Sequence, residues 1–218
     1  MKQLFIQIFY FLIVRPWLSL IIGVRFENKA VLNEARRYII VANHNSHFDM
    51  VSILAAVPIR KLKHTYAVAA ADYFTKTPFR DWGMRTFFNA ILIRRQKEAG
   101  QPSAIEQLDG HLKDGRSLIM FPEGSRGEPG VMADFKKGVA ILLKNHPSIP
   151  FVPVYLDGFG RVLPKNSNLI VPLVCKVRFG KPIYPETEDI DEILEQVKTA
   201  ILDLREKDER DRNRFRFD

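Results

Sequence analysis

Short apolar runs that alternate with helical patterns constrain the fold of this chain more than any other feature of its sequence. Runs typical of buried strands lie at 38–43, 65–70, 89–95, 117–121, 150–156 and 169–180. Helical patterns lie between and after them, at 46–57, 78–85, 102–115, 134–145 and 187–207. This alternation predicts an α/β domain with a mostly parallel central sheet flanked by helices. In such sheets, functional groups gather at the carboxyl ends of the strands.

The chain of 218 residues is long enough for one domain with an appendage, on a prior of roughly 150 residues per domain. We expect hydrophobic membrane-docking helices at 1–26, a main domain at 27–208 and a charged tail at 209–218. Hydrophobic residues make up 46% of the sequence, which supplies a sizeable core. The single cysteine, Cys175, excludes an intrachain disulfide.

The N-terminal segment is apolar on nearly every face. Its runs 4–14 and 17–24 are each shorter than the roughly 20 residues that cross a bilayer, and Arg15 and Pro16 separate them. We therefore expect two short helices, broken at Arg15–Pro16, that dip into one leaflet with Arg15 and Trp17 at the level of the headgroups. Two alternatives stay open, namely a helix buried against the main domain and a single kinked membrane span.

The formal net charge of +8 and the isoelectric point near 9.6 favour anionic partners. Nucleic acid, anionic lipid and an acidic carrier protein all fit that charge. No nucleic-acid-binding motif is present, and basic residues are scattered among acidic ones, so we expect no nucleic-acid partner. The charge is better suited to an anionic membrane surface.

The densest polar cluster, NHNSHFD at 43–49, overlaps the end of the apolar run at 38–43. Ser46 and Asp49 fit a variant of the helix capping box, which explains two residues of the cluster but not His44. On one regular helix, His44 and Asp49 would lie about 140° apart and could not pair. If His44 instead sits on the strand-to-helix turn, Asp49 can accept a hydrogen bond from its Nδ1–H and leave Nε2 free as a general base.

The same cluster admits a second interpretation as a metal site. His44, His47 and Asp49 form a two-histidine, one-carboxylate set, which would make the protein a metal-dependent hydrolase. This site requires His47 to face inward, and the other histidines lie outside any paired spacing. We therefore expect no metal and interpret His47 as an exposed residue of the first helical turn.

Two further polar segments follow predicted strands. ILIRR at 91–95 places an arginine at the end of a strand, where its guanidinium can grip a phosphate or a carboxylate. Because successive strand side chains point to opposite faces, only one of Arg94 and Arg95 should face a site. The segment FPEGSRG opens a strand into a glycine-rich loop, in which Glu123 could hold Arg126 in place.

A fourth segment, IPFVPV at 149–154, carries two prolines, which predict a sheet edge or a strand end that lines a groove. Together, NHNSHFD, ILIRR, FPEGSR and IPFVPV resemble the four ordered sequence blocks of the glycerolipid acyltransferase family, whose best-known activity is 1-acylglycerol-3-phosphate acyltransferase. The resemblance covers residues 39–154, about half of the chain. The hydrophobic start also looks like the membrane-docking helices of relatives.

This resemblance implies a role for each matching residue. His44 would be the general base, and Asp49 the residue that orients it. Arg95 and the glycine-rich loop would bind or frame the head group of the acceptor. The matching loop residues are Glu123, Gly124, Ser125 and Arg126. An acylated Ser46 is the alternative within the same class of reaction.

The implied reaction moves a fatty acyl group from a thioester, either acyl-CoA or acyl carrier protein, to a hydroxyl of a lysophospholipid, with lysophosphatidate favoured. It needs no cofactor beyond the acyl donor, and it would occur at the cytoplasmic face of the cell membrane on a peripheral or monotopic protein. Ser125 stands where many relatives carry Thr or Gly, and Arg94 where many lysophosphatidate enzymes carry Asp. These departures keep glycerol 3-phosphate, other lysolipids and amino-acid lipids open as acceptors.

Overall fold

The computed structural model describes residues 2–46, 48–71, 78–94, 100–125, 127, 131–162 and 175–214. Its strands are β1 (Val24–Glu27), β2 (Ile39–Ala42), β3 (Thr65–Ala70), β4 (Ala90–Ile93), β5 (Ser117–Met120), β6 (Phe151–Asp157) and β7 (Cys175–Phe179). Within the described residues they form a seven-stranded sheet in the order β1-β7-β6-β2-β5-β3-β4. Each strand expected from the sequence is present at least in part, and β1 is an additional one.

The sheet is mostly parallel, as the sequence predicts. The strands from β2 to β6 all run in the same direction. β7 runs antiparallel to β6, and β1 pairs in parallel with β7, so these two strands run opposite to the rest. The ends of β2, β5 and β6 consequently lie together along one side of the sheet, which we call the carboxyl edge.

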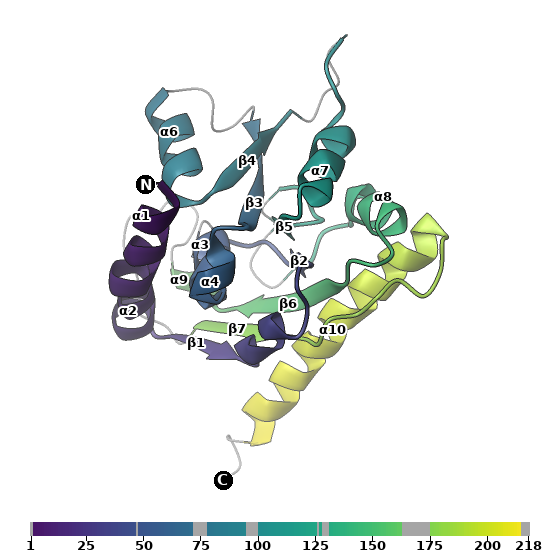
Figure 1. Ribbon diagram of the computed structural model, residues 1–218. Helices are drawn as coiled ribbons and strands as arrows, with labels where there is room; N and C mark the ends of the chain where they lie inside the picture. The colour runs from purple at the N-terminus through teal and green to yellow at the C-terminus, as the bar shows by residue number, and fades with distance from the viewer. Residues whose placement is uncertain are drawn as a thin grey trace.

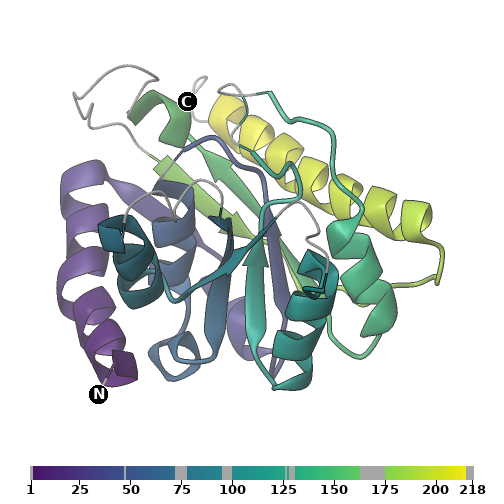
Figure 2. The ribbon, with the colours of Figure 1, turned by 90° about the horizontal axis from the view of Figure 1, so that it is seen from above.

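Helices cover both faces of the sheet (Figures 1 and 2). One face carries the N-terminal helical stretch together with α3 (Phe48–Ala56), α4 (Ile59–Leu62) and α6 (Pro78–Phe87). The other face carries α7 (Ala104–Lys113), α8 (Gly138–Asn145) and the long α10 (Ile190–Arg214). The short helices η3 (Lys29–Asn33) and α9 (Phe159–Val162) lie in connections. The result is a three-layer α/β domain of the class that the sequence predicts.

The two faces of β2 show how the sheet separates two hydrophobic cores. Ile40 and Ala42 belong to a buried cluster with the N-terminal helical stretch and α3. Ile39 and Val41 belong to a second cluster with α7, α8 and α10. All four side chains are fully buried, as expected for a parallel strand that helices cover on both faces.

The N-terminal segment forms one continuous helical stretch over Lys2–Ile22 and not two helices. It consists of α1 (Lys2–Phe9), η1 (Tyr10–Val14), α2 (Arg15–Trp17) and η2 (Leu18–Ile22), of which η1 and η2 are π-helical. The prediction of a break at Arg15–Pro16 was wrong because a wider π-turn precedes the proline. There the N–H of Arg15 bonds to the carbonyl of Tyr10 instead of that of Phe11, which accommodates the proline ring.

The π-turns also keep one side of this stretch against the domain. Its buried residues follow a constant spacing of four along the sequence and are Ile6, Tyr10, Val14, Leu18 and Ile22. In a regular α-helix of 3.6 residues per turn, such a row would wind around the axis. The π-turns hold more residues per turn, so the row stays in line. The opposite side is exposed and apolar, with Leu4, Phe5, Ile8, Phe11, Leu12, Ile13, Leu20 and Ile21.

Two polar side chains of this stretch turn toward the domain. Arg15 donates through Nε to the carbonyl of Ala55 at 2.6 Å and through Nη2 to the carbonyl of Val57, at the C-terminal end of α3. Gln7 donates to the carbonyl of Ile59 at 2.8 Å. The guanidinium of Arg15 thus binds a helix end whose carbonyls carry partial negative charge. Its expected place at the level of the headgroups stays a prediction.

β6 lies inside the sheet between β7 and β2, so the prediction of a sheet edge from Pro150 and Pro153 was wrong. Pro150 lies before the strand. The carbonyl of Pro153 accepts a hydrogen bond from the N–H of Gly180, which follows the last residue of β7. The N and the C=O of a strand residue point to the same side, so the nitrogen of Pro153 also faces β7. It lies opposite Gly180, just beyond the end of β7, so its missing N–H interrupts no hydrogen bond between the two strands.

The C-terminal helix α10 continues to Arg214 and includes the first part of the segment expected as a tail at 209–218. Asp208 on this helix is 1% exposed and pairs with Lys176 at 2.9 Å and with Arg178 at 3.4 Å, both on β7. These ion pairs hold the second half of α10 against the sheet. Residues 215–218 lie outside the described part of the chain.

Candidate active site

Polar side chains gather at the carboxyl edge, where the sequence pattern places them. β2 and β5 are hydrogen-bonded neighbours, and each is followed by one of the polar segments. His44 follows β2 and Glu123 follows β5, and the backbone N–H of His44 donates to Oε1 of Glu123 at 2.8 Å. The segments NHNSHFD and FPEGSRG therefore meet in one site.

His44 pairs with Asp49 across the strand-to-helix turn. The distance from Nδ1 of His44 to Oδ2 of Asp49 is 2.9 Å, and the side chain of Asp49 is completely buried. The same Oδ2 accepts hydrogen bonds from the backbone N–H groups of Asn45 at 2.6 Å and Ser46 at 2.8 Å. The predicted hydrogen bond is thus present, and it lies at the N-terminus of α3, as the spacing requires.

This geometry fixes the orientation of the imidazole ring. A carboxylate oxygen that three donors share cannot easily turn away from the ring, and it requires a proton on Nδ1. In the neutral form of the ring Nε2 then carries no proton, and within the described residues no hydrogen bond to Nε2 is present. The side chain of His44 is 18% exposed, so the ring is partly accessible to solvent.

Two neighbouring contacts hold this turn in place. The ring of Phe121 stacks on the His44 ring, with centroids 4.1 Å apart and planes inclined by 21°. Asn43 donates to the carbonyl of Leu156 at 3.0 Å and accepts from its N–H at 2.8 Å, which fastens the end of β2 to β6. Neither contact could be predicted from the sequence, where the available signals are an aromatic residue before Pro122 and an asparagine before His44.

Glu123 is 3% exposed and binds backbone groups with both carboxylate oxygens. Oε1 accepts from the N–H of His44 at 2.8 Å, and Oε2 accepts from the N–H of Ala133 at 3.0 Å. Burial raises the pKa of the Glu123 carboxyl, and the two backbone hydrogen bonds partly offset that effect. Glu123 therefore frames the site from within, by positioning the backbone of His44.

Gly124 and Ser125 lie at the surface of the loop that Glu123 anchors. Gly124 has a φ of 71°, and a Cβ built there would lie 2.9 Å from both Cε and Nζ of Lys136. Lys136 is exposed and was not among the residues predicted to form the site. The sequence feature that could have indicated Lys136 is the pair of lysines directly before α8. This lysine adds a cation where the anionic head group of the acceptor is expected.

Three of the residues singled out from the sequence, Arg95, Arg126 and His47, lie outside the described residues, so their roles stay predictions. Arg94 is exposed just after β4. In the part of the chain that the structure describes, no group of three His, Cys, Asp or Glu side chains could hold a metal ion. The metal interpretation depends on His47 and likewise stays a prediction.

The backbone N–H groups around the site are largely engaged already. Those of His44, Asn45 and Ser46 donate to the carboxylates of Asp49 and Glu123. They cannot also stabilise an oxyanion that develops on a reacting carbonyl. Such an oxyanion therefore needs donors other than these three N–H groups.

A model of the acyltransferase family matches residues 23–157, which is more than half of the chain and includes His44, Asp49 and Glu123. The chain belongs to the acyltransferase family. The match begins just after the N-terminal helical stretch and ends with β6. It therefore covers all of the carboxyl edge that carries the site.

The chain is similar to several curated proteins named 1-acyl-sn-glycerol-3-phosphate acyltransferase. It is 28% identical over 151 residues to the chloroplastic protein BAT2 of Brassica napus, covering 69% of this chain and 42% of that protein. It is 29% identical over 171 residues to the protein of Saccharomyces cerevisiae, covering 76% of this chain and 54% of that protein. The chain spans about half the length of the curated relatives it matches.

The fold is similar to the crystal structure of the 1-acyl-sn-glycerophosphate (LPA) acyltransferase PlsC from Thermotoga maritima. The TM-score is 0.69 at 25% sequence identity, and the likeness covers 93% of this chain and 79% of that chain. The α/β fold class expected from the sequence is therefore confirmed, as is the family indicated by the four sequence blocks.

Proposed function

We propose that this protein is an O-acyltransferase that moves a fatty acyl group from a thioester to the hydroxyl of a lysophospholipid, with lysophosphatidate as the favoured acceptor. The observation that carries the proposal is the His44–Asp49 pair at the carboxyl edge, with Nε2 turned away from the carboxylate, in a chain of the acyltransferase family. The names of the curated relatives and of the PlsC structure support the choice of acceptor.

His44 acts as the general base. Its neutral imidazole takes the proton of the acceptor hydroxyl at Nε2 while the hydroxyl oxygen attacks the thioester carbonyl carbon, which is worth roughly 10²–10⁴-fold in rate. The C–S bond then breaks, and the departing thiolate takes the proton from the imidazolium. Asp49 keeps the ring in place and stabilises the imidazolium through Nδ1–H.

Direct transfer fits the described residues better than an acyl-enzyme does. Ser46 is 4% exposed, and its Oγ accepts a hydrogen bond from the N–H of Phe48 at 3.3 Å as part of the helix cap. Cys175 is completely buried in the apolar core. Neither side chain is placed to attack a thioester that arrives from the solvent.

Cations around the loop after β5 supply affinity for the phosphate of the acceptor. Lys136 lies beside Gly124, and Ser125 adds a hydroxyl to the same loop. We assign phosphate binding to Arg95 and Arg126 as well, because a guanidinium binds phosphate through paired hydrogen bonds. The acyl donor is acyl-CoA or acyl carrier protein, either of which brings negative charge to a chain of net charge +8.

The N-terminal helical stretch brings the site to the membrane that contains the acceptor. By length and composition this stretch is apolar enough to cross a bilayer, with a mean hydropathy of 1.9. We favour docking into one leaflet, because one side of it is buried against the domain while the other is exposed and apolar. Trp17 contacts Phe48 at the start of α3, with ring centroids 5.9 Å apart, so the docked helix lies beside the site. We place the protein at the cytoplasmic face of the cell membrane.

A thioester-consumption assay tests the proposed reaction. The chain is offered acyl-CoA or acyl carrier protein together with lysophosphatidate, glycerol 3-phosphate, other lysophospholipids or amino-acid lipids. We expect thiol release to be fastest with lysophosphatidate and to produce the diacyl product. Absence of transfer to every acceptor contradicts the proposal. Activity that disappears with EDTA and returns with zinc or iron would support the metal-dependent hydrolase instead.

A further inference from the structure

A second helix continues the exposed apolar side of the N-terminal stretch. α6 lies beside α1 in both ribbon views (Figures 1 and 2). Phe87, at the end of α6, packs against α1 with ring centroids 6.0 Å from Phe5 and 5.1 Å from Phe9. Trp82 stands edge-on to Phe87 at 5.5 Å and is itself 53% exposed. Apolar surface is therefore continuous from Phe5, which is 48% exposed, to Trp82.

The two helices that form this surface each carry an exposed cation, Lys2 on α1 and Arg85 on α6. Partial burial lowers the pKa of Lys2, and the nearby charge of Arg85 lowers it further. Arg85 also pairs with Asp81 of its own helix at 3.0 Å. An anion between Lys2 and Arg85 would relieve the repulsion between them.

We propose that Lys2, Phe5, Trp82, Arg85 and Phe87 bind anionic lipid and extend the membrane-docking surface from the N-terminal stretch onto α6. We call these five residues the Trp82 patch. Tryptophan is suited to the headgroup level of a bilayer, and basic side chains are attracted to anionic lipids there. The inference rests on the proposed function, which requires a lipid acceptor. It adds a docking helix from within the main domain and a preference for anionic lipid.

A bilayer fits the Trp82 patch better than a second copy of the chain does. In a two-fold dimer through this surface, Lys2 and Arg85 would approach the same cations of the other copy. A bilayer offers phosphate groups to the cations and acyl chains to the aromatic rings. Gln7 and Arg15 turn their polar groups toward the domain, so the apolar side that adjoins the patch is free of their charge and polarity.

Vesicle sedimentation of the full chain tests this proposal. Vesicles of phosphatidylcholine are compared with vesicles that also contain phosphatidylglycerol, in the absence of acyl donor and acceptor. We expect Trp82→Ala to weaken binding to both kinds of vesicle about tenfold, because it removes apolar surface that the bilayer buries. Arg85→Gln should weaken binding about fivefold on phosphatidylglycerol vesicles alone, and less so at high salt.

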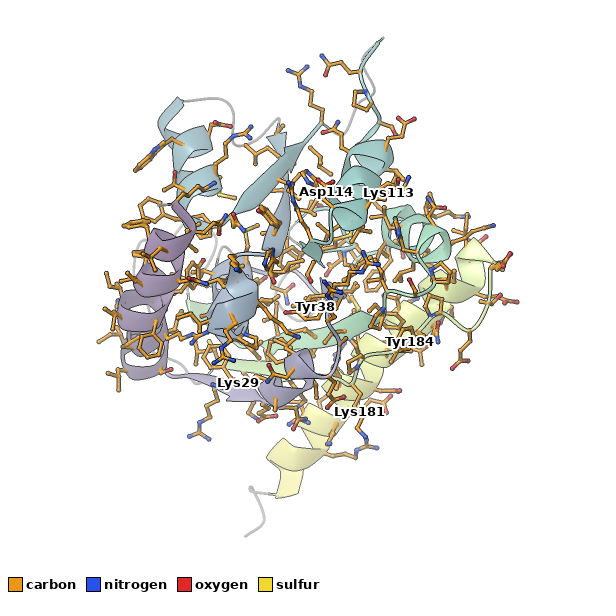
Figure 3. The ribbon with its side chains drawn as sticks, in the orientation of Figure 1. Lys29, Tyr38, Lys113, Asp114, Lys181 and Tyr184 are labelled. Carbon is orange, nitrogen blue, oxygen red and sulfur yellow. The ribbon has the colours of Figure 1, made fainter. Side chains whose placement is uncertain are left out.

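Tyr184→Ala and Lys181→Gln are the matched controls. Tyr184 is 54% exposed, close to the value for Trp82, and both control residues lie far from the N-terminal helix (Figure 3). We expect both controls to bind vesicles as the unchanged chain does. Equal binding by Trp82→Ala and Tyr184→Ala overturns the proposal. A dimer in lipid-free solution that Trp82→Ala dissociates would overturn it in favour of a second copy.

The result can be separated from the proposed activity, because binding is measured without turnover. A chain that binds phosphatidylglycerol vesicles through the Trp82 patch but transfers no acyl group contradicts only the proposed function. Transfer to lysophosphatidate together with unchanged vesicle binding by Trp82→Ala contradicts only the patch. Thermal unfolding verifies that each variant is folded, and Trp82→Phe, which keeps an aromatic ring, should lose less binding than Trp82→Ala.

Discussion

Among the described residues, two histidine–aspartate pairs have almost the same length and very different settings. Nδ1 of His44 lies 2.9 Å from Oδ2 of Asp49, and Nε2 of His146 lies 2.8 Å from Oδ1 of Asp109. A distance between a ring nitrogen and a carboxylate oxygen therefore does not distinguish a candidate base from a structural hydrogen bond. The difference between the two pairs must come from what surrounds each carboxylate.

Asp49 is completely buried and accepts two backbone N–H groups besides the ring, so its partners among the described residues are fixed parts of the fold. Asp109 is 18% exposed and also binds Nζ of Lys113 at 2.6 Å. His44 lies at the carboxyl edge beside the loop after β5, whereas His146 ends α8 in the outer layer. The first pair therefore differs from the second in having a buried carboxylate that the backbone holds at the carboxyl edge.

Replacing the two histidines should give the largest contrast. We expect His44→Ala to lower kcat/KM for acyl transfer by about 10³-fold or more, because it removes the general base. His146→Ala should change kcat/KM by less than about twofold, since His146 lies at the end of α8 and away from the carboxyl edge. The measurement is thiol release at saturating donor, with circular dichroism to verify folding. Normal turnover in His44→Ala would falsify the mechanism.

Replacing the two aspartates with asparagine should give the next largest contrast. In Asp49→Asn, the amide oxygen takes the place of Oδ2, because the N–H groups of Asn45 and Ser46 donate to that position. The ring keeps its hydrogen bond but loses the negative charge that stabilises the imidazolium, so we expect a loss of about 10²–10⁴-fold in kcat. Asp109→Asn serves as the control and should retain the unchanged rate. Similar rates for the two variants would show that the burial of Asp49 has no catalytic importance.

Replacing Glu123, which accepts a hydrogen bond from the N–H of His44, should have a smaller effect on activity and an effect on stability that depends on pH. The glutamine oxygen in Glu123→Gln can still accept one of the two backbone hydrogen bonds. Its NH₂ group faces the other backbone N–H, so that hydrogen bond is lost, which should lower the free energy of unfolding by about 1–3 kcal/mol. We also expect kcat/KM to fall about tenfold, because the backbone of His44 is displaced. Urea unfolding and thiol release measure the two effects.

The sign of the pH dependence follows from the raised pKa of Glu123, since the folded carboxyl binds its proton more tightly than the unfolded one. Its contribution to stability is full below the unfolded pKa of about 4.3 and is lost as the pH rises through the higher folded pKa. The stability of the unchanged chain relative to Glu123→Gln should therefore be greatest in acid and decrease toward neutral pH. A difference that grows toward neutral pH would contradict this placement of the carboxyl.

The strands from β2 to β6 and their common direction could be predicted because each is an apolar run that alternates with helical patterns. Ile39–Ala42 illustrates this, since helices cover both of its faces and no polar side chain interrupts it. β1 could not be predicted, because VRFE is short and mixed and its only signal is pairing with a strand far away in the sequence. Pro153 misled the prediction because the tolerance for a proline depends on where the neighbouring strand ends.

The same distinction between local and distant partners applies to the site. His44 and Asp49 could be paired from the sequence because one turn and one helix start determine their geometry. The partners of Glu123 could not, because one of them, the N–H of His44, lies 79 residues away. The hydrogen bonds of Arg15 could not be predicted for a similar reason, since their acceptors at the C-terminal end of α3 lie about 40 residues further along the chain. The local hydrogen bond between His44 and Asp49 could be predicted, and these hydrogen bonds between distant segments could not.

The pairing of β1 with β7 has a consequence for how the protein is made. Within the described residues β1 is hydrogen-bonded to β7 and to no other strand, with Val24 opposite Cys175. A ribosome that adds 5–20 residues per second reaches β7 on the order of ten seconds after β1. During this interval β1 cannot pair with β7, because β7 has not yet been synthesised. The apolar helix in front of β1 can therefore reach a membrane while the rest of the chain is still being synthesised.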